Sequence, residues 1–111
     1  MNLREIDDNF SIAEQIHESD LMILKEAGYT DIVCNRPDYE DPGQPCFAEL
    51  EAEAVKHGLR THHLAFDGRD FTPGHIAGLR EVLDSAEGKT VAFCRTGNRS
   101  LLLWSRVDRD D

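Results

Sequence analysis

Short apolar segments alternate with amphipathic segments along this chain, and glycines and prolines separate them. This alternation predicts parallel strands that are joined by helical crossovers. We therefore expect an α/β fold in which a mainly parallel sheet of about four strands is flanked by helices. Because 111 residues leave room for one such domain, we expect a single domain over 1–111, with an ordered core over about 9–107.

The individual elements can be placed from the spacing of the apolar residues. Alternating or continuous apolar runs predict strands at 10–16, 31–34, 59–66 and 90–93. Apolar residues at helical spacing predict helices at 18–27, at 46–57, from 73 to about 88, and from 100 onward. Three prolines and a glycine make 35–45 the longest loop, and we expect the tail 108–111 to fray.

The charge balance excludes several classes of partner. The chain has 22 acidic and 12 basic residues and a formal net charge of −10 at pH 7, which repels nucleic acids and anionic membrane surfaces.

The chain has an odd number of cysteines, Cys34, Cys46 and Cys94, and its first residues are too polar for a secretory leader. These features predict a cytoplasmic protein with reduced cysteines.

The histidines do not have the spacing of metal ligands. Two of them, His62 and His63, are neighbours on a predicted strand, so their side chains should point to opposite faces of the sheet. We therefore expect no metal site and no cofactor. The five histidines are His17, His57, His62, His63 and His75.

The loops that follow the predicted strands carry the polar residues suited to chemistry. In a parallel sheet these loops gather at one edge, where ligands of open α/β folds bind. Arg36 and Asp38 follow the second strand, and Asp67 and Asp70 follow the third. The fourth strand runs into a loop made of Cys94, Arg95, Thr96, Gly97, Asn98, Arg99 and Ser100. We expect this loop, Arg36 and Asp38 to bind the substrate around Cys94.

The loop after the fourth strand has the residues needed to stabilise a negative charge. A tight turn with Gly97 inside it can direct successive backbone N–H groups inward, and the start of the next helix adds its positive end. A cysteine at this position is stabilised as the thiolate, which is the nucleophilic form. Arg99 offers a planar fork to an oxyanion, and Ser100 can donate its hydroxyl. The pattern predicts that Cys94 is a catalytic nucleophile.

The same loop resembles the active-site loops of two enzyme families. Cysteine-dependent phosphatases have His-Cys, five further residues and then Arg, whereas here Phe93 precedes Cys94 and four residues separate Cys94 from Arg99. Many rhodanese sulfurtransferases have the shorter spacing, and their cysteine carries a persulfide. The loop length therefore favours the rhodanese type.

Three segments in a fixed order widen the resemblance to nearly the whole chain. They are 10–16, the pair Asn35-Arg36-Pro37-Asp38 and Pro42-Gly43-Gln44-Pro45, and the Cys94 loop. Together they resemble the beta-lactamase-hydrolase-like protein, phosphatase-like domain family. The resemblance implies a three-layer fold of the cysteine-phosphatase type. Members occur alone or fused to a metallo-hydrolase of the persulfide dioxygenase type, which implies a link to sulfide oxidation and a separate metallo-hydrolase as a partner.

Three functions follow as hypotheses, and all three take a small anionic substrate. The first, which the family resemblance favours, is a phosphatase-like hydrolase in which Cys94 attacks phosphorus and Arg99 binds the oxygens. An aspartate then protonates the leaving group, and the candidates are Asp67 or Asp70, with Asp38 as a third. The second is a sulfurtransferase that carries a persulfide on Cys94 and needs no general acid. The third is a non-catalytic module that senses a thiol or an oxyanion.

The other two cysteines have less specific surroundings. Cys34 lies among Ile32 and Val33, and we expect it to be a buried small hydrophobic residue. Cys46 lies at the start of a predicted helix, where it is either incidental or able to resolve an oxidised Cys94.

Overall fold

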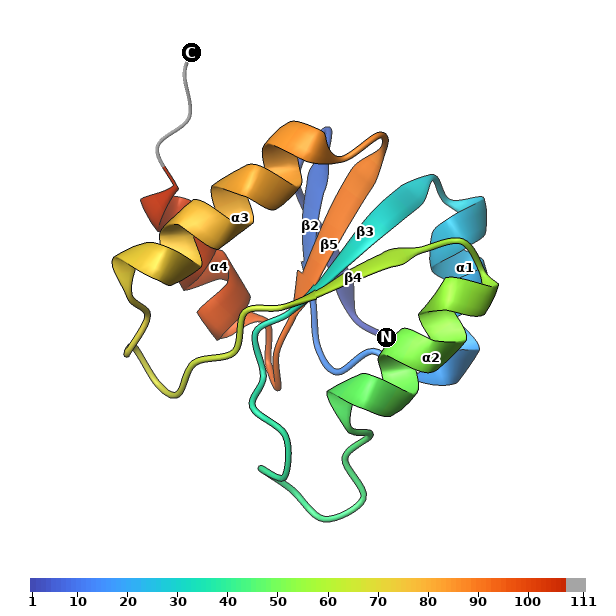
Figure 1. Cartoon of the computed structure of the whole chain (residues 1–111), viewed down its shortest axis with the longest axis horizontal. Coiled ribbons are helices and arrows are strands. Elements are labelled where there is room, and N and C mark those ends of the chain that lie inside the picture. The colour runs from blue at the N-terminus through green and yellow to red at the C-terminus, as the bar shows by residue number, and fades with distance from the viewer. Residues whose placement is uncertain (108–111) are drawn as a thin grey trace.

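The sheet has five strands in the order β1-β2-β5-β3-β4 among residues 1–107, which are the residues that the computed structural model describes. The strands are β1 (Leu3–Asp7), β2 (Phe10–Ala13), β3 (Tyr29–Cys34), β4 (Arg60–His63) and β5 (Lys89–Phe93). The strands β2, β5, β3 and β4 run parallel to one another, and β1 pairs antiparallel with β2 (Figure 1). The carboxyl ends of β2, β5, β3 and β4 therefore lie at one edge.

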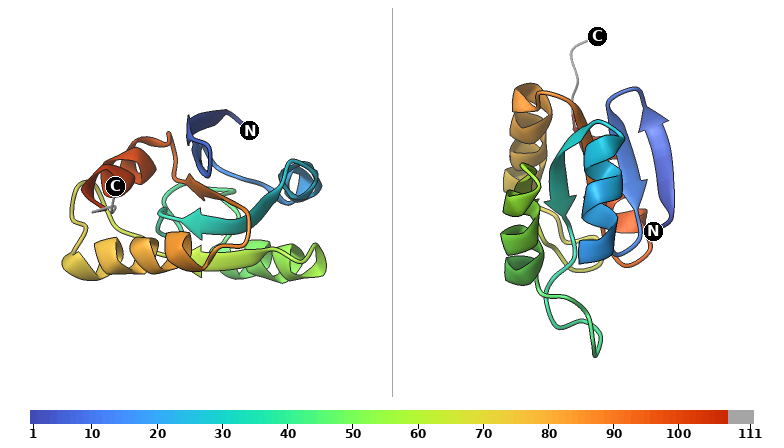
Figure 2. Two further views of the ribbon diagram at one scale, coloured as in Figure 1. Left: turned by 90° about the horizontal axis from the view of Figure 1, so that it is seen from above. Right: turned by 90° about the vertical axis from the view of Figure 1, so that its right-hand side faces the viewer.

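Helices cover both faces of the sheet and make a three-layer domain (Figure 2). They are the 3-10 turn η1 (Glu18–Asp20), α1 (Leu21–Glu26), α2 (Phe47–Lys56), α3 (Pro73–Ser85) and α4 (Asn98–Arg106). Neighbouring residues of β3 point to opposite faces, since Ile32 packs with Leu24 of α1 and Leu50 of α2, whereas Val33 packs with Leu79 of α3 and Leu103 of α4. The predicted α/β fold with a mainly parallel sheet and flanking helices is confirmed.

The main difference from the expected architecture is the strand β1. The sequence predicts about four strands and assigns no element to Leu3–Asp7, which form a fifth. β1 is an edge strand whose side chains are mostly exposed, so it gains backbone hydrogen bonds from β2 without burying an apolar face. Apolar periodicity therefore gives no signal for it. The prediction for the tail 108–111 lies outside the described residues.

The element boundaries also differ from the expected ones at the sheet edge that carries the candidate site. The strand predicted at 10–16 ends at Ala13, and the strand predicted at 59–66 spans only Arg60–His63. Ile16 and Phe66, which suggested the longer strands, are buried all the same, because the chain turns over the core after each strand. The last helix starts two residues before Ser100, at Asn98.

The register of the parallel strands fixes where the polar loops begin. Phe93, the last residue of β5, is paired with Ala13 of β2 and with Cys34 of β3. The amide of Cys94 donates to the Ala13 carbonyl (3.3 Å), and the amide of Asn35 donates to the Phe93 carbonyl (2.9 Å). The residues after β2, β3 and β5 thus leave the sheet side by side.

Among residues 1–107, no helix is both long enough and apolar enough to cross a membrane.

Candidate active site

Cys94 lies directly after β5, at the start of a sharp turn that leads into α4. The turn depends on Gly97, whose φ of 93° lies in the left-handed region that residues with a side chain rarely adopt. Gly97 is also the N-cap of α4 and supplies no side chain to cap the helix, so the amides of the first helical turn stay available. The sequence thus places free N–H groups next to the cysteine.

These amides converge on the sulfur of Cys94. The N–H of Gly97 donates to Sγ at 3.0 Å. Burial of this thiol, whose residue is 0% exposed, raises its pKa, but hydrogen bonds from backbone amides outweigh burial, and the pKa lies below the ordinary value. The amides that act on the sulfur belong to Ser100, Thr96, Arg99 and Gly97. A substrate must move a covering group to reach this sulfur, because Cys94 has no exposed surface.

Arg99 is the second component of the site and comes from the first turn of α4. Its Nη1 and Nη2 donate to Oε2 and Oε1 of Glu40, each at 2.8 Å, and Nη1 also donates to the carbonyl of Phe66 at 3.2 Å. The hydrogen bonds to Glu40, together with the nearby Cys94 sulfur, raise the pKa of Arg99. The guanidinium therefore stays charged beside the cysteine.

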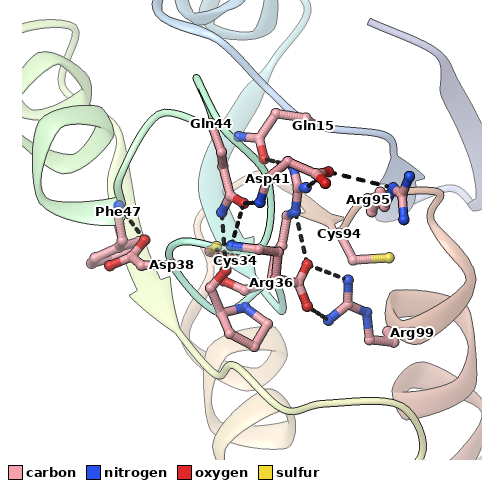
Figure 3. Close-up of polar contacts among 12 residues, drawn as sticks. Gln15, Cys34, Arg36, Asp38, Asp41, Gln44, Phe47, Cys94, Arg95 and Arg99 are labelled. Atoms are coloured by element: carbon pink, nitrogen blue, oxygen red, sulfur yellow. Dashed lines mark hydrogen bonds and ion pairs between the residues drawn. The ribbon is translucent and has the colours of Figure 1, made fainter.

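Glu40 is shared between two arginines. Its Oε1 also accepts from Nε of Arg36 at 2.9 Å, and the hydrogen bonds from Arg99 and Arg36 lower the pKa of Glu40 to about 2. Arg36 itself is only 4% exposed, and it makes further hydrogen bonds to Oε1 of Gln15 (2.9 Å) and to Asp41. Figure 3 shows Arg36 between Gln15 and Asp41, with Arg99 and Cys94 on the side of α4.

An open pocket of about 590 Å³ lies over this cluster. Arg95 reaches its rim from the loop and pairs with Asp41 at 3.5 Å. Asp67 and Gly68, from the loop after β4, also line the pocket. The residues that line the pocket are Pro37, Glu40, Asp41, Asp67, Gly68, Arg95 and Arg99.

The other two predicted acids lie outside this pocket. Asp38 accepts a hydrogen bond from the amide of Phe47 at 2.8 Å, so its carboxylate holds the start of α2. Asp70 is exposed, and its amide bonds back to the carbonyl of Asp67 at 2.9 Å. Of the three predicted acids, only Asp67 lines the pocket that contains Arg99.

The remaining predicted loop residues lie on other sides of Cys94. Thr96 Oγ1 accepts from the amide of Asn98 at 3.3 Å, and both residues line a separate hollow of about 370 Å³ beside β1 and β2. Ser100 is 0% exposed, and its hydroxyl makes no hydrogen bond within the described residues. Ser100 therefore acts on Cys94 through its backbone amide.

The two other cysteines differ from Cys94 in their surroundings. Burial raises the pKa of Cys34 to about 12, although its thiol donates to the carbonyl of Arg36 at 3.3 Å. Cys46 is half-buried at the N-cap of α2, where its side chain makes no capping hydrogen bond. Cys34 and Cys94 are both buried, yet the pKa of Cys34 is raised and that of Cys94 is lowered.

Sequence reasoning missed Glu40 and Gln15. Both are charged or polar residues in segments that also contain several similar ones, so composition does not single them out. The only local signal is that Arg36 and Glu40 have opposite charges and lie four residues apart. This spacing forms ion pairs on helices, but the segment is a loop rich in proline, so helix geometry does not predict the pair. The role of Glu40 can be recognised only from the structure, in which the loop after β3 contacts α4.

Known proteins are similar to this chain over most or all of its length. The chain is 27% identical to a beta-lactamase hydrolase-like protein of Xylella fastidiosa over an alignment that covers all of this chain and 27% of the relative. It therefore spans about a quarter of the length of that relative. A candidate phosphatase from Neisseria meningitidis has a solved structure that matches with a TM-score of 0.82 and 32% identity, over 91% of this chain and 72% of that one.

A more distant structure supports the fold alone. P. aeruginosa TpbA, solved as a cysteine-to-serine variant in complex with pTyr, matches with a TM-score of 0.68 and 15% identity, over 92% of this chain and 59% of that one.

The family model for the beta-lactamase hydrolase-like protein, phosphatase-like domain, matches residues 2–109. This chain therefore belongs to that phosphatase-like family.

Proposed function

We propose that this domain is a cysteine-dependent sulfurtransferase in which the Cys94 thiolate is the nucleophile and carries the transferred sulfur as a persulfide. The observation that carries the proposal is the convergence of four backbone amides on the Cys94 sulfur. Those amides favour the ionised thiol before the reaction and can hold a negative outer sulfur after it. Fold resemblance to phosphatases does not decide the reaction, because function depends on the site.

The reaction has two balanced steps. In the first step the Cys94 thiolate attacks the sulfane sulfur of a donor such as thiosulfate. A sulfur–sulfur bond to Cys94 forms while the donor's own sulfur–sulfur bond breaks, and sulfite leaves with the electron pair. A thiolate or cyanide acceptor then attacks the outer sulfur, and the Cys94 thiolate leaves. No general acid is needed, and sulfur moves without an added oxidant or reductant.

Loop length favours this reaction over phosphoryl transfer. Four residues separate Cys94 from Arg99, one fewer than in cysteine phosphatases, so the amides surround a smaller volume. A single outer sulfur atom fits a smaller cradle than a phosphoryl group with its three oxygens. Moreover, Glu40, the carboxylate closest to Arg99, has a pKa of about 2 and has no proton to give near neutral pH.

Phosphate-ester hydrolysis is the second candidate, and two observations favour it. The fold is that of phosphatases, and Asp67 lines the same pocket as Arg99. In this reaction Cys94 would attack phosphorus, Arg99 and the amides would hold the equatorial oxygens, and Asp67 would protonate the leaving oxygen.

The proposal includes a location and a partner. A low-pKa thiolate keeps its activity in a reducing compartment, so we propose that the domain works in the cytoplasm. The curated relative is about four times longer than this chain, and we propose that a separate metallo-hydrolase of the persulfide dioxygenase type uses the sulfur that this domain hands on.

The first test compares the two reactions side by side. Wild-type protein is assayed for thiocyanate formation from thiosulfate and cyanide and for hydrolysis of p-nitrophenyl phosphate, with Cys94→Ser as the control. We expect thiocyanate formation that Cys94→Ser abolishes, and intact mass spectrometry after thiosulfate treatment should show one added sulfur that the variant lacks. Phosphate release that depends on Cys94, without a sulfur adduct, would select the second candidate. No turnover of either substrate would leave a binding or sensing module.

The second test compares the reactivity of the cysteines. Iodoacetamide should modify Cys94 before Cys34 and Cys46 near neutral pH, since each unit by which the pKa falls raises the thiolate fraction about tenfold. Cys34 is the matched control, because it is also buried and its pKa is raised to about 12. Peptide mapping after short labelling measures the three rates, and equal labelling of Cys94 and Cys34 would contradict the proposal.

The third test separates the roles of the two loop arginines. Arg99→Lys removes the planar fork beside Cys94 and should lower kcat/KM by about 100-fold, the scale of losing one oxyanion donor. Arg95→Lys keeps the charge of an exposed side chain at the pocket rim and should change kcat/KM by less than about threefold. Steady-state kinetics on both variants checks this, and equal losses would argue against the role given to Arg99.

A further inference from the structure

A further pocket, of about 510 Å³, lies at the edge of the sheet opposite Cys94. Residues from the last turns of α3 and α4 and from the starts of β2 and β5 line it. Figure 1 shows these ends of the elements at the opposite end of β5 from its arrowhead, which leads to Cys94. A pocket of this volume suits a small organic molecule.

Aromatic and aliphatic side chains supply the apolar part of the lining. Phe10, at the start of β2, is 1% exposed and stacks on Trp104 of α4, with the ring centroids 5.7 Å apart and the ring planes 10° apart. Leu83 of α3 and Val107 add aliphatic surface. These side chains can bury the apolar body of a ligand.

Thr90, the second residue of β5, brings a polar group to this apolar lining. Val91 packs on the side of α1 and α2 and Ala92 on the side of α3 and α4, so Thr90 points to the α3 and α4 side, where the pocket lies. Thr90 is 1% exposed, and its Oγ1 makes no hydrogen bond within residues 1–107. A buried hydroxyl without a partner costs free energy, so a ligand that donates to Oγ1 from the pocket gains a hydrogen bond.

Acidic side chains give the pocket a negative charge. Asp7, Asp84 and Glu87 line it, and no basic side chain of residues 1–107 forms an ion pair with them. Among the described residues that line the pocket, Arg80 is the only basic one. The carboxylates therefore outnumber the guanidinium, and both they and the face of an indole ring attract cations.

From these features we propose that the pocket binds a small organic cation, with a primary ammonium group on a flat apolar body. The ammonium group donates hydrogen bonds to Thr90 Oγ1 and to the acidic side chains, and the apolar body contacts Phe10 and Trp104. Such a ligand has only donors at its polar end, which matches a pocket that offers acceptors. The proposal does not depend on the function proposed for Cys94.

The pocket contains its own spectroscopic probe, because Trp104 is the single tryptophan of the chain. Phenethylamine, which is protonated at neutral pH, is titrated into the wild-type protein while the fluorescence of Trp104 is recorded. The matched probes 2-phenylethanol and 3-phenylpropionate have a similar apolar body without charge and with a negative charge. We expect a saturable change with phenethylamine and a dissociation constant at least about tenfold lower than with either matched probe, the effect of a charge-assisted hydrogen bond.

Three variants test which groups recognise the cation. Thr90→Val keeps the shape of the side chain and should weaken phenethylamine binding about tenfold, while Tm should not fall because the lost hydroxyl has no partner. Asp84→Asn should weaken binding about threefold, as for a partly exposed ion pair. Glu81→Gln removes the same charge from an exposed position of α3 outside the pocket, and binding should stay close to that of wild type. Turnover at Cys94, at the opposite edge, should be unchanged in all three.

Several outcomes would overturn the proposal. Absence of a saturable change with phenethylamine would mean that the pocket binds no such cation. Equal or tighter binding of 2-phenylethanol or 3-phenylpropionate would reject the charge of the ligand, and unchanged binding by Thr90→Val would remove the hydroxyl from the site. Equal weakening by Asp84→Asn and Glu81→Gln would mean that the net charge of the chain, rather than the pocket, attracts the amine. Loss of the reaction proposed for Cys94 would leave these results unaffected, so the two proposals fail separately.

Discussion

The amide hydrogens that converge on the Cys94 sulfur are the interaction on which the rest of the site depends. They are present because β5 ends in the middle of a parallel sheet and the chain must turn at once into α4. Gly97 makes that turn by adopting a φ of 93°, which leaves the first N–H groups of the helix without partners in the helix. The backbone thus stabilises negative charge on sulfur, and the guanidinium of Arg99 lies beside it.

The second constraint is the balance of charges around this anion. The chain has a formal net charge of −10, yet the pocket beside the Cys94 loop is lined by Arg95 and Arg99, and the buried Arg36 binds the same acidic residues. Glu40 and Asp41 bind these arginines and keep them in place. An anionic substrate would be repelled by most of the surface and attracted to one site, so acidity of the whole chain and anion binding at the site are compatible.

Sequence reasoning recovered the features that local patterns determine. The alternation of strands and helices predicted the parallel sheet, and the strand-loop-helix pattern predicted the position of Cys94 and Arg99. Contacts between distant segments could not be predicted in this way: Glu40 meets Arg99 across 59 residues of sequence, and Gln15 meets Arg36 across 21. Asp38 illustrates the same limit, since its place beside Arg36 suggested a substrate contact and the structure shows its carboxylate on the amide of Phe47. The edge strand β1 had no apolar signal because it buries little.

The most direct measurement of the central claim is a pH titration of thiolate absorbance, taken as the difference between wild-type protein and Cys94→Ser. If the loop amides outweigh burial, the difference signal will show a midpoint below about 8.5, the pKa of a free cysteine. A midpoint at or above that value would show that burial dominates, and Cys94 would then be a structural cysteine rather than a nucleophile.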